Sequence, residues 1–122
     1  MTSPSGIPSI DVTEAERRLR EDPAKPLLLD VREANEFAVV RAPGAALLPT
    51  SVLAVRVDEV PTDRPILVVC AVGGRSAMVT QFLVARGRTD VTNVAGGMDA
   101  WERAGLPIVR GTPAPGEGDL PA

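Results

Sequence analysis

Histidine is absent from this chain of 122 residues, and cysteine occurs once, as Cys70. Without histidine there can be no Ser-His or Cys-His nucleophile pair, and no zinc site of the common His/Cys kinds. A single cysteine cannot form a disulfide within the chain, which agrees with a reducing compartment. If the Cys70 thiol is activated, backbone dipoles or arginine must activate it.

Aromatic residues and excess positive charge are also scarce. The chain has two Phe, one Trp and no Tyr, and its 13 basic and 16 acidic residues give a net charge of −3. Nucleic-acid binding relies on basic patches and, for single strands, on stacking aromatic rings. Nucleic acid is therefore not an expected partner. The core must consist of Val, Leu, Ile and Ala, which suits buried parallel strands.

Long apolar runs are missing as well. No window reaches the roughly 18 consecutive apolar residues of a membrane span, and residues 1–10 lack the basic and apolar regions of a signal peptide. We expect no membrane association and a cytoplasmic location. Pro, Gly and Ser concentrate at both ends, so residues 1–8 and 111–122 are predicted to be flexible tails around one domain at 9–110.

Apolar runs alternate with helical patterns along this domain. Strands are predicted at residues 10–12, 27–31, 46–48, 66–70 and 91–94, and helices at 13–22, 33–40, 51–57, 75–86 and around Trp101. Thr13 and Glu16 form a capping-box pattern, and the helix at 75–86 is apolar nearly all round, which predicts deep burial. The alternation predicts an α/β fold with a mainly parallel sheet and helices on both faces. Ligand sites in such folds lie beyond the carboxyl ends of the strands.

Cys70 ends the clearest strand and begins the loop Cys70-Ala71-Val72-Gly73-Gly74-Arg75-Ser76. Its glycines permit positive φ angles, so successive N–H groups can form an anion nest at the start of the next helix. Hydrogen bonds, the helix dipole and Arg75 would together stabilise a thiolate. The alternatives are that Cys70 is a small apolar core residue and that the two glycines form a plain tight turn. We favour the reactive thiol, because a plain turn does not require Arg and Ser next.

Several motifs together resemble the rhodanese-like sulfurtransferase family. They are LLLDVRE followed by EF and PGA, then VVC..GGRSA, V.NVAGGMDAW and AGLPIV, and they stand in the family's order from about Ile10 to Val109. The resemblance implies a five-stranded, mostly parallel sheet flanked by helices. It also implies that Cys70 carries transferable sulfur as a persulfide by double displacement, with Arg75 and the loop backbone stabilising the anion, and with no metal or organic cofactor.

Two features of the loop bear on the substrate. Four residues separate Cys70 from Arg75, as in the sulfurtransferase branch, whereas related phosphatases have five; phosphatase activity is discounted and arsenate reduction is a lesser alternative. Ala71 stands where the family often has Arg, and apolar Val72 follows it, so an anionic donor would meet one loop arginine instead of two. We expect weak thiosulfate turnover and a protein or low-molecular-weight persulfide as donor, with a thiol or cyanide as acceptor.

The resemblance also suggests residues for the rim of the pocket: Asp30, Arg32, Glu36, Arg41, Met98 and Trp101. For most of them we favour a structural role, with Asp30 capping the next helix, Arg32 pairing with Glu36 at helical spacing, and Arg41 altering packing or rim charge where relatives often have histidine. Ser76 is expected to cap or hydrogen-bond within the loop. The rival hypothesis is a non-catalytic binding or regulatory module with a vestigial cysteine.

Overall fold

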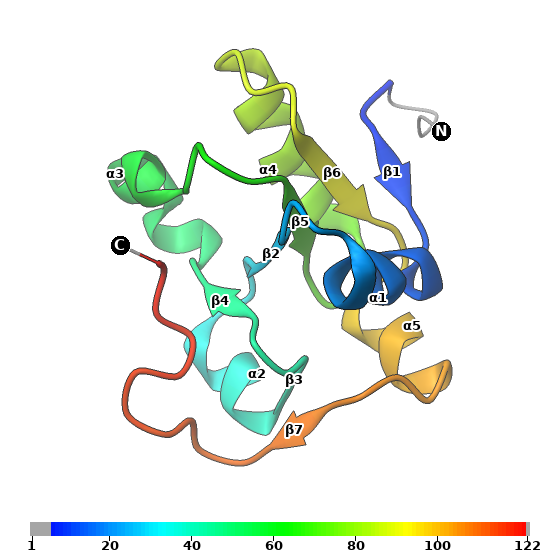
Figure 1. The fold of residues 1–122 in the computed structure, drawn as a ribbon. Helices are drawn as coiled ribbons and strands as arrows, with labels where there is room; N and C mark the ends of the chain where they lie inside the picture. The colour runs from blue at the N-terminus through cyan, green and yellow to red at the C-terminus, as the bar shows by residue number, and fades with distance from the viewer. Residues whose placement is uncertain (1–5, 122) are drawn as a thin grey trace.

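A parallel sheet of five strands forms the centre of the computed structural model, which describes residues 6–121 (Figure 1). The strands lie in the order β1-β6-β5-β2-β4, and each neighbouring pair is parallel. Their bounds are β1 Ser9–Ile10, β2 Leu27–Asp30, β4 Ala46–Leu47, β5 Ile66–Val69 and β6 Val91–Val94. The predicted α/β class with a mainly parallel sheet is confirmed.

Within residues 6–121, four α-helices lie between these strands in the chain and a fifth, α5, follows β6. They are α1 Val12–Glu21, α2 Ala34–Val39, α3 Leu53–Arg56, α4 Gly74–Ala85 and α5 Gly97–Arg103, and 3-10 turns at Thr50–Val52 and Val57–Glu59 flank α3. A separate antiparallel ribbon, which the sequence did not predict, joins β3 Val40–Arg41 to β7 Val109–Arg110.

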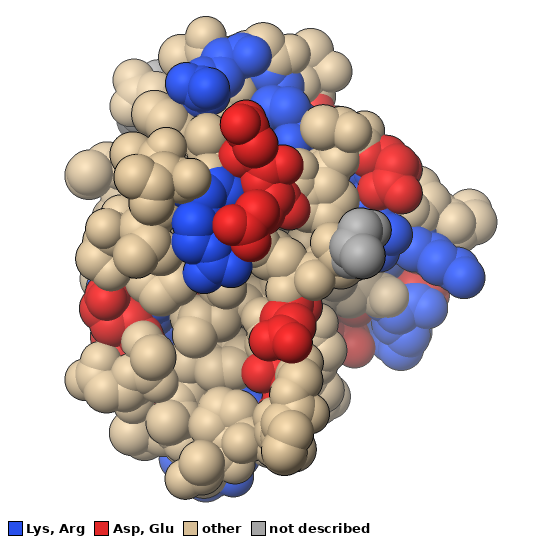
Figure 2. Space-filling view, turned by 90° about the vertical axis from the view of Figure 1, so that its left-hand side faces the viewer, with Lys and Arg blue, Asp and Glu red and all other residues tan. Residues whose placement is uncertain are grey.

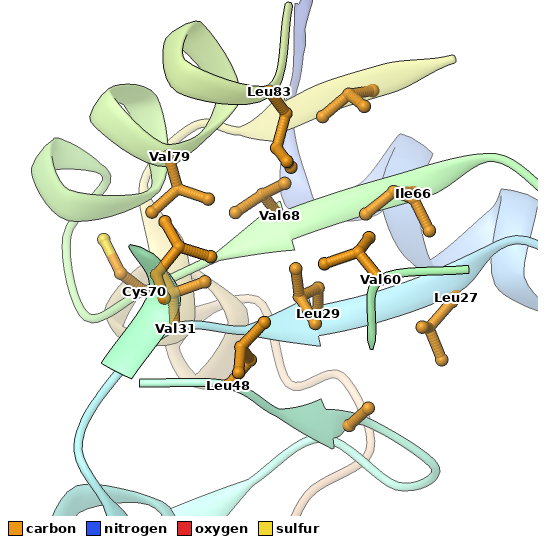
Figure 3. Close-up of a cluster of buried hydrophobic side chains, with 13 residues drawn as sticks. Leu27, Leu29, Val31, Leu48, Val60, Ile66, Val68, Cys70, Val79 and Leu83 are labelled. Carbon is orange, nitrogen blue, oxygen red and sulfur yellow. The ribbon is translucent and has the colours of Figure 1, made fainter. Parts of the chain in front are cut away.

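Side chains alternate between the two faces of the sheet and build one core on each. On one face Leu29 and Val68 pack with residues of α3 and α4. We call this group the first core cluster, and Figure 3 shows it. On the other face Leu28 and Leu67 pack against α1, α2 and α5. Because successive strand residues point to opposite faces, continuous apolar runs such as 66–69 fill both cores at once.

Two helix predictions differ from the structure at their ends. The α1 helix is capped by Asp11, whose carboxylate accepts a hydrogen bond from the Glu14 amide at 2.8 Å, and not by Thr13. Asp11 is as good a cap as threonine and lies two residues earlier, so the helix starts there. The helix predicted at 51–57 is divided into α3 and its two flanking 3-10 turns.

The prediction that the helix at 75–86 is deeply buried was wrong. Val79 and Leu83 are buried against the sheet, but Met78 and Val84 are 68% and 39% exposed. A helix on the outside of a sheet can bury only the stripe that faces the sheet, whatever the composition of its other side.

Both ends of the domain contact its core. Ile7 is buried, and the Pro8 carbonyl accepts a hydrogen bond from the Asn93 amide at 2.8 Å. After β7 the chain passes α2 and β4 and ends near α3 (Figure 1), and the Gly118 carbonyl accepts a hydrogen bond from Leu47. The expected flexibility of the tails stays a prediction, and residues 1–5 and 122 lie outside the described part of the chain.

Charges of both signs are interspersed on the surface. Figure 2 shows this for the face on the α3 side, where basic and acidic side chains lie next to one another. Over residues 6–121, no helix is both long enough and apolar enough to cross a membrane.

Candidate active site

Cys70 follows directly after β5, the strand between β2 and β6, and therefore lies at the carboxyl edge of the sheet. The next residues turn sharply into α4. Gly73 is the N-cap of this helix and has a φ of +111°, a backbone conformation that side chains rarely adopt. With this turn the Gly73 amide donates a hydrogen bond to the Cys70 sulfur at 3.1 Å.

The thiol is buried, with Cys70 only 1% exposed. Figure 3 places Cys70 at the end of the first core cluster, beside Val31 and Val79. The burial agrees with the interpretation of Cys70 as a small apolar core residue, whereas the hydrogen bond from Gly73 agrees with the anion nest. Both features that the sequence suggested as alternatives are thus present in one residue.

Ser76 completes the surroundings of the sulfur. Its hydroxyl donates to the Gly73 carbonyl at 3.1 Å and accepts from the Cys70 thiol at 3.3 Å, and the residue is fully buried. Burial raises the pKa of Cys70, but hydrogen bonds from Ser76, Gly73 and Val72 together outweigh it, so the pKa is lowered. The site therefore makes the Cys70 thiol more acidic without histidine.

Arg75 points to a carboxylate on α2 and forms a bidentate ion pair with it. Its two terminal nitrogens donate to the Glu36 oxygens at 2.7 and 2.8 Å. Arg75 lowers the pKa of Glu36 to about 2, and Glu36 in turn raises the pKa of Arg75. The guanidinium that we expected to stabilise the Cys70 anion is therefore held by another anion.

The start of α5 is hydrogen-bonded to the backbone of the active-site loop, a contact that the sequence did not predict. The amides of Met98 and Asp99 donate to the carbonyls of Cys70 and Ala71 at 2.8 and 2.9 Å. Gly97 has a φ of +60°, and a Cβ atom there would lie 2.5 Å from both carbonyl oxygens. The Gly96-Gly97 pair in the sequence was the one signal of this close approach.

Asp30 and Arg32 form a buried ion pair of their own. Arg32 donates to the Asp30 carboxylate at 2.7 Å and to the Val40 carbonyl at 2.7 Å. The expected roles of Asp30 as a helix cap and of Arg32 as the partner of Glu36 were wrong, because α2 is capped by Glu33 and Arg32 precedes the helix. Helical spacing does not apply to a residue outside the helix.

Three other residues suggested for the rim are buried in other surroundings. Met98 and Trp101 belong to the core between the sheet and α1, and the Trp101 indole donates to the Pro107 carbonyl at 2.8 Å. Arg41 donates to the Gly111 carbonyl and to Glu117. The structure brings together Cys70, its loop, Glu36 and the backbone of Met98, but neither Arg41 nor Trp101.

Comparisons with known proteins agree with this arrangement. The model of the rhodanese-like domain family matches residues 11–104. A sulfurtransferase of Allochromatium vinosum is 37% identical over 103 residues, which make up 84% of this chain and 95% of that protein. Thiosulfate sulfurtransferase GlpE of Actinobacillus succinogenes is 39% identical over 82 residues, 67% of this chain and 74% of that protein.

Solved structures give the same result. A rhodanese-related protein from Thermoplasma volcanium is 28% identical and has a TM-score of 0.76, covering 84% of this chain and 97% of its own. A protein from Staphylococcus saprophyticus, SSP1007, is 32% identical with a TM-score of 0.73, covering 83% and 99%. The sheet order, the loop after β5 and these matches agree, and the chain belongs to the rhodanese-like domain family.

Proposed function

We propose that this domain is a sulfurtransferase that carries sulfur as a persulfide on Cys70. The observation that carries the proposal is the hydrogen bond that the Gly73 amide donates to the Cys70 sulfur, which stabilises an anion at that position. Relatives named sulfurtransferase, at 37% and 39% identity, support it.

The reaction has two displacement steps. The Cys70 thiolate attacks the outer sulfur of a donor persulfide R–S–S⁻, the donor's S–S bond breaks, and R–S⁻ leaves with the electron pair. The product on the protein is Cys70–S–S⁻. An acceptor thiolate or cyanide then attacks the outer sulfur, forming a new bond to it and returning Cys70 as the thiolate.

The loop supplies donors for the added sulfur. The first amides of a helix have no partner within the helix, so those of Gly74 and Arg75 at the start of α4 are available to a second sulfur atom. Four residues between Cys70 and Arg75 favour a cradle for sulfur over one for phosphate. We propose small sulfur compounds or a persulfide-carrying protein as partners, in a reducing, cytoplasmic setting.

A second candidate is a non-catalytic binding module. The 1% exposure of Cys70 favours it, because a sealed thiol cannot meet a donor. In this case the loop and the buried sulfur would only stabilise the fold.

Intact-mass measurement after incubation with sulfane donors distinguishes the two candidates. We expect the protein to gain the mass of one sulfur atom, to lose it on addition of cyanide, and to gain nothing as the Cys70→Ser variant. No adduct from thiosulfate, cysteine persulfide or polysulfide would reject the sulfur carrier and leave the binding module.

A further inference from the structure

We propose that Glu36 determines donor specificity by cancelling the charge of Arg75, which disfavours anionic donors at Cys70. The inference rests on the proposed sulfurtransferase function and names the donor class: persulfides of low net charge. Glu36 lies on α2, thirty-nine positions before Arg75 in the chain, and meets it only in the fold.

The loop contains one charged residue. From Cys70 to Ser76 that residue is Arg75, and both of its terminal nitrogens are bound by the Glu36 carboxylate. The two side chains are 36% and 31% exposed, so the pair lies at the surface, and Arg75 stands in the first turn of α4, directly after the loop that begins with Cys70. An anion therefore meets a neutral pair instead of a free guanidinium.

The carboxylate is fixed in this position from two sides. Glu36 also accepts a hydrogen bond from the Glu33 amide at 3.0 Å, which belongs to the capping box of α2. The nearby guanidinium of Arg32 offers no replacement charge, because it is buried against Asp30. Arg32 after β2 and Arg75 after β5 are thus both paired with carboxylates, and neither is free to attract an anionic donor.

The size of the effect follows from Coulomb's law. We take charges about 8 Å apart and an effective dielectric constant of about 60. Removal of the Glu36 charge then raises the rate of reaction of Cys70 with a singly charged anion about threefold, and with a dianion about tenfold. A donor with no net charge gains nothing. Donors that differ in charge therefore report on Glu36 directly.

Glu36→Gln is the central variant, because its amide oxygen can still accept the Glu33 hydrogen bond while the charge on Arg75 is released. We expect sulfur loading of Cys70 to accelerate about tenfold with thiosulfate and about threefold with cysteine persulfide, and to stay unchanged with cysteamine persulfide. Equal acceleration of all three donors, or of none, would overturn the proposal.

Asp63→Asn is the matched control. Asp63 also pairs with an arginine, Arg64, but it precedes β5 and so lies at the opposite end of the strand from Cys70. Asp63→Asn removes one negative charge from the molecule, as Glu36→Gln does, and we expect no change in the rate of sulfur loading with any donor. An equal effect of both variants would assign the result to net charge and overturn the role of Glu36.

Alkylation tests the same charge without sulfur transfer. The ratio of Cys70 alkylation by iodoacetate, an anion, to that by neutral iodoacetamide should rise about threefold in Glu36→Gln and fall about threefold in Arg75→Gln. Opposite changes exclude unfolding as their cause. An unchanged ratio overturns the proposal, whereas a shifted ratio without sulfur loading by any donor supports the charge effect and rejects the proposed function.

Discussion

The Ser76 hydroxyl links the sulfur to its loop, because it contacts both Cys70 and the Gly73 carbonyl. A hydroxyl can rotate, so it can donate to the sulfur once the thiol has lost its proton. Ser76→Ala removes this donor from a buried site. One hydrogen bond to a charged group is worth about 1.5 kcal/mol or more, which corresponds to about one pKa unit.

We therefore expect Ser76→Ala to raise the pKa of Cys70, because the thiolate loses a hydrogen-bond donor. The measurement is the rate of iodoacetamide alkylation across pH, whose midpoint should lie below the ordinary cysteine value in the natural protein. Ser51→Ala is the control, since the Ser51 hydroxyl is exposed and donates to Glu33. An unshifted midpoint in Ser76→Ala would show that the Ser76 hydroxyl does not stabilise the Cys70 thiolate.

The order of residues was enough to predict the loop, but not the partners of its side chains. A cysteine at a strand end, followed by two glycines and a helix start, indicated the contacts of Cys70 with Gly73 and Ser76. The partner of Arg75 comes from another helix, and no local pattern relates the two. Arg32 and Glu36 have helical spacing, yet Arg32 lies before the helix and turns to Asp30.

The junction of α5 with the active-site loop depends on Gly97. Its positive φ strains any side chain by about 1–3 kcal/mol, and a Cβ atom would also collide with the carbonyls of Cys70 and Ala71. Gly105 has a similar φ of +73°, but a Cβ atom there would meet nothing within 4 Å. An alanine at Gly105 would therefore suffer backbone strain alone, whereas an alanine at Gly97 would suffer both strain and a steric clash.

We expect Gly97→Ala to lower the free energy of unfolding by at least about 2 kcal/mol more than Gly105→Ala. Urea unfolding measures this difference. The displaced loop should also make Cys70 more accessible to iodoacetamide in Gly97→Ala alone. Equal losses of stability in the two variants would show that the loop tolerates the extra atom.

Elements with a strong apolar pattern were predicted well, and the short strands β3 and β7 were not predicted. The run at 66–69 is buried at every position, as a central parallel strand requires. The ribbon between β3 and β7 has two residues in each strand, too few for any periodicity to show. The exposed side of α4 escaped prediction because apolar residues occur on both of its faces.

The segment after β7 is attached to the rest of the molecule through Arg41. This residue is 2% exposed, and its guanidinium donates to the carbonyls of Phe37 and Gly111 and to the Glu117 carboxylate. Leu120 packs against the first core cluster. The Pro- and Gly-rich composition behind the prediction of a flexible tail carries no information about Arg41, which lies seventy positions before Gly111.

Arg41→Met keeps a long apolar side chain and removes these hydrogen bonds, which leaves the Gly111 carbonyl without this donor and Glu117 with the Ala114 amide alone. We expect it to lower the free energy of unfolding by about 2–4 kcal/mol at pH 7, measured with urea. Arg110→Met is the control, because Arg110 is 61% exposed in its pair with Glu102 and should change stability by less than about 1 kcal/mol.

The effect of Arg41→Met should also depend on pH. Arg41 holds the pKa of Glu117 below its ordinary 4.5, so the folded state binds fewer protons there than the unfolded chain. The contribution of the pair is complete above about pH 4.5 and is lost as pH falls through the lowered pKa. The stability difference between the natural protein and Arg41→Met should therefore shrink below pH 4.5, and a constant difference would show that the Glu117 charge contributes nothing to holding the segment.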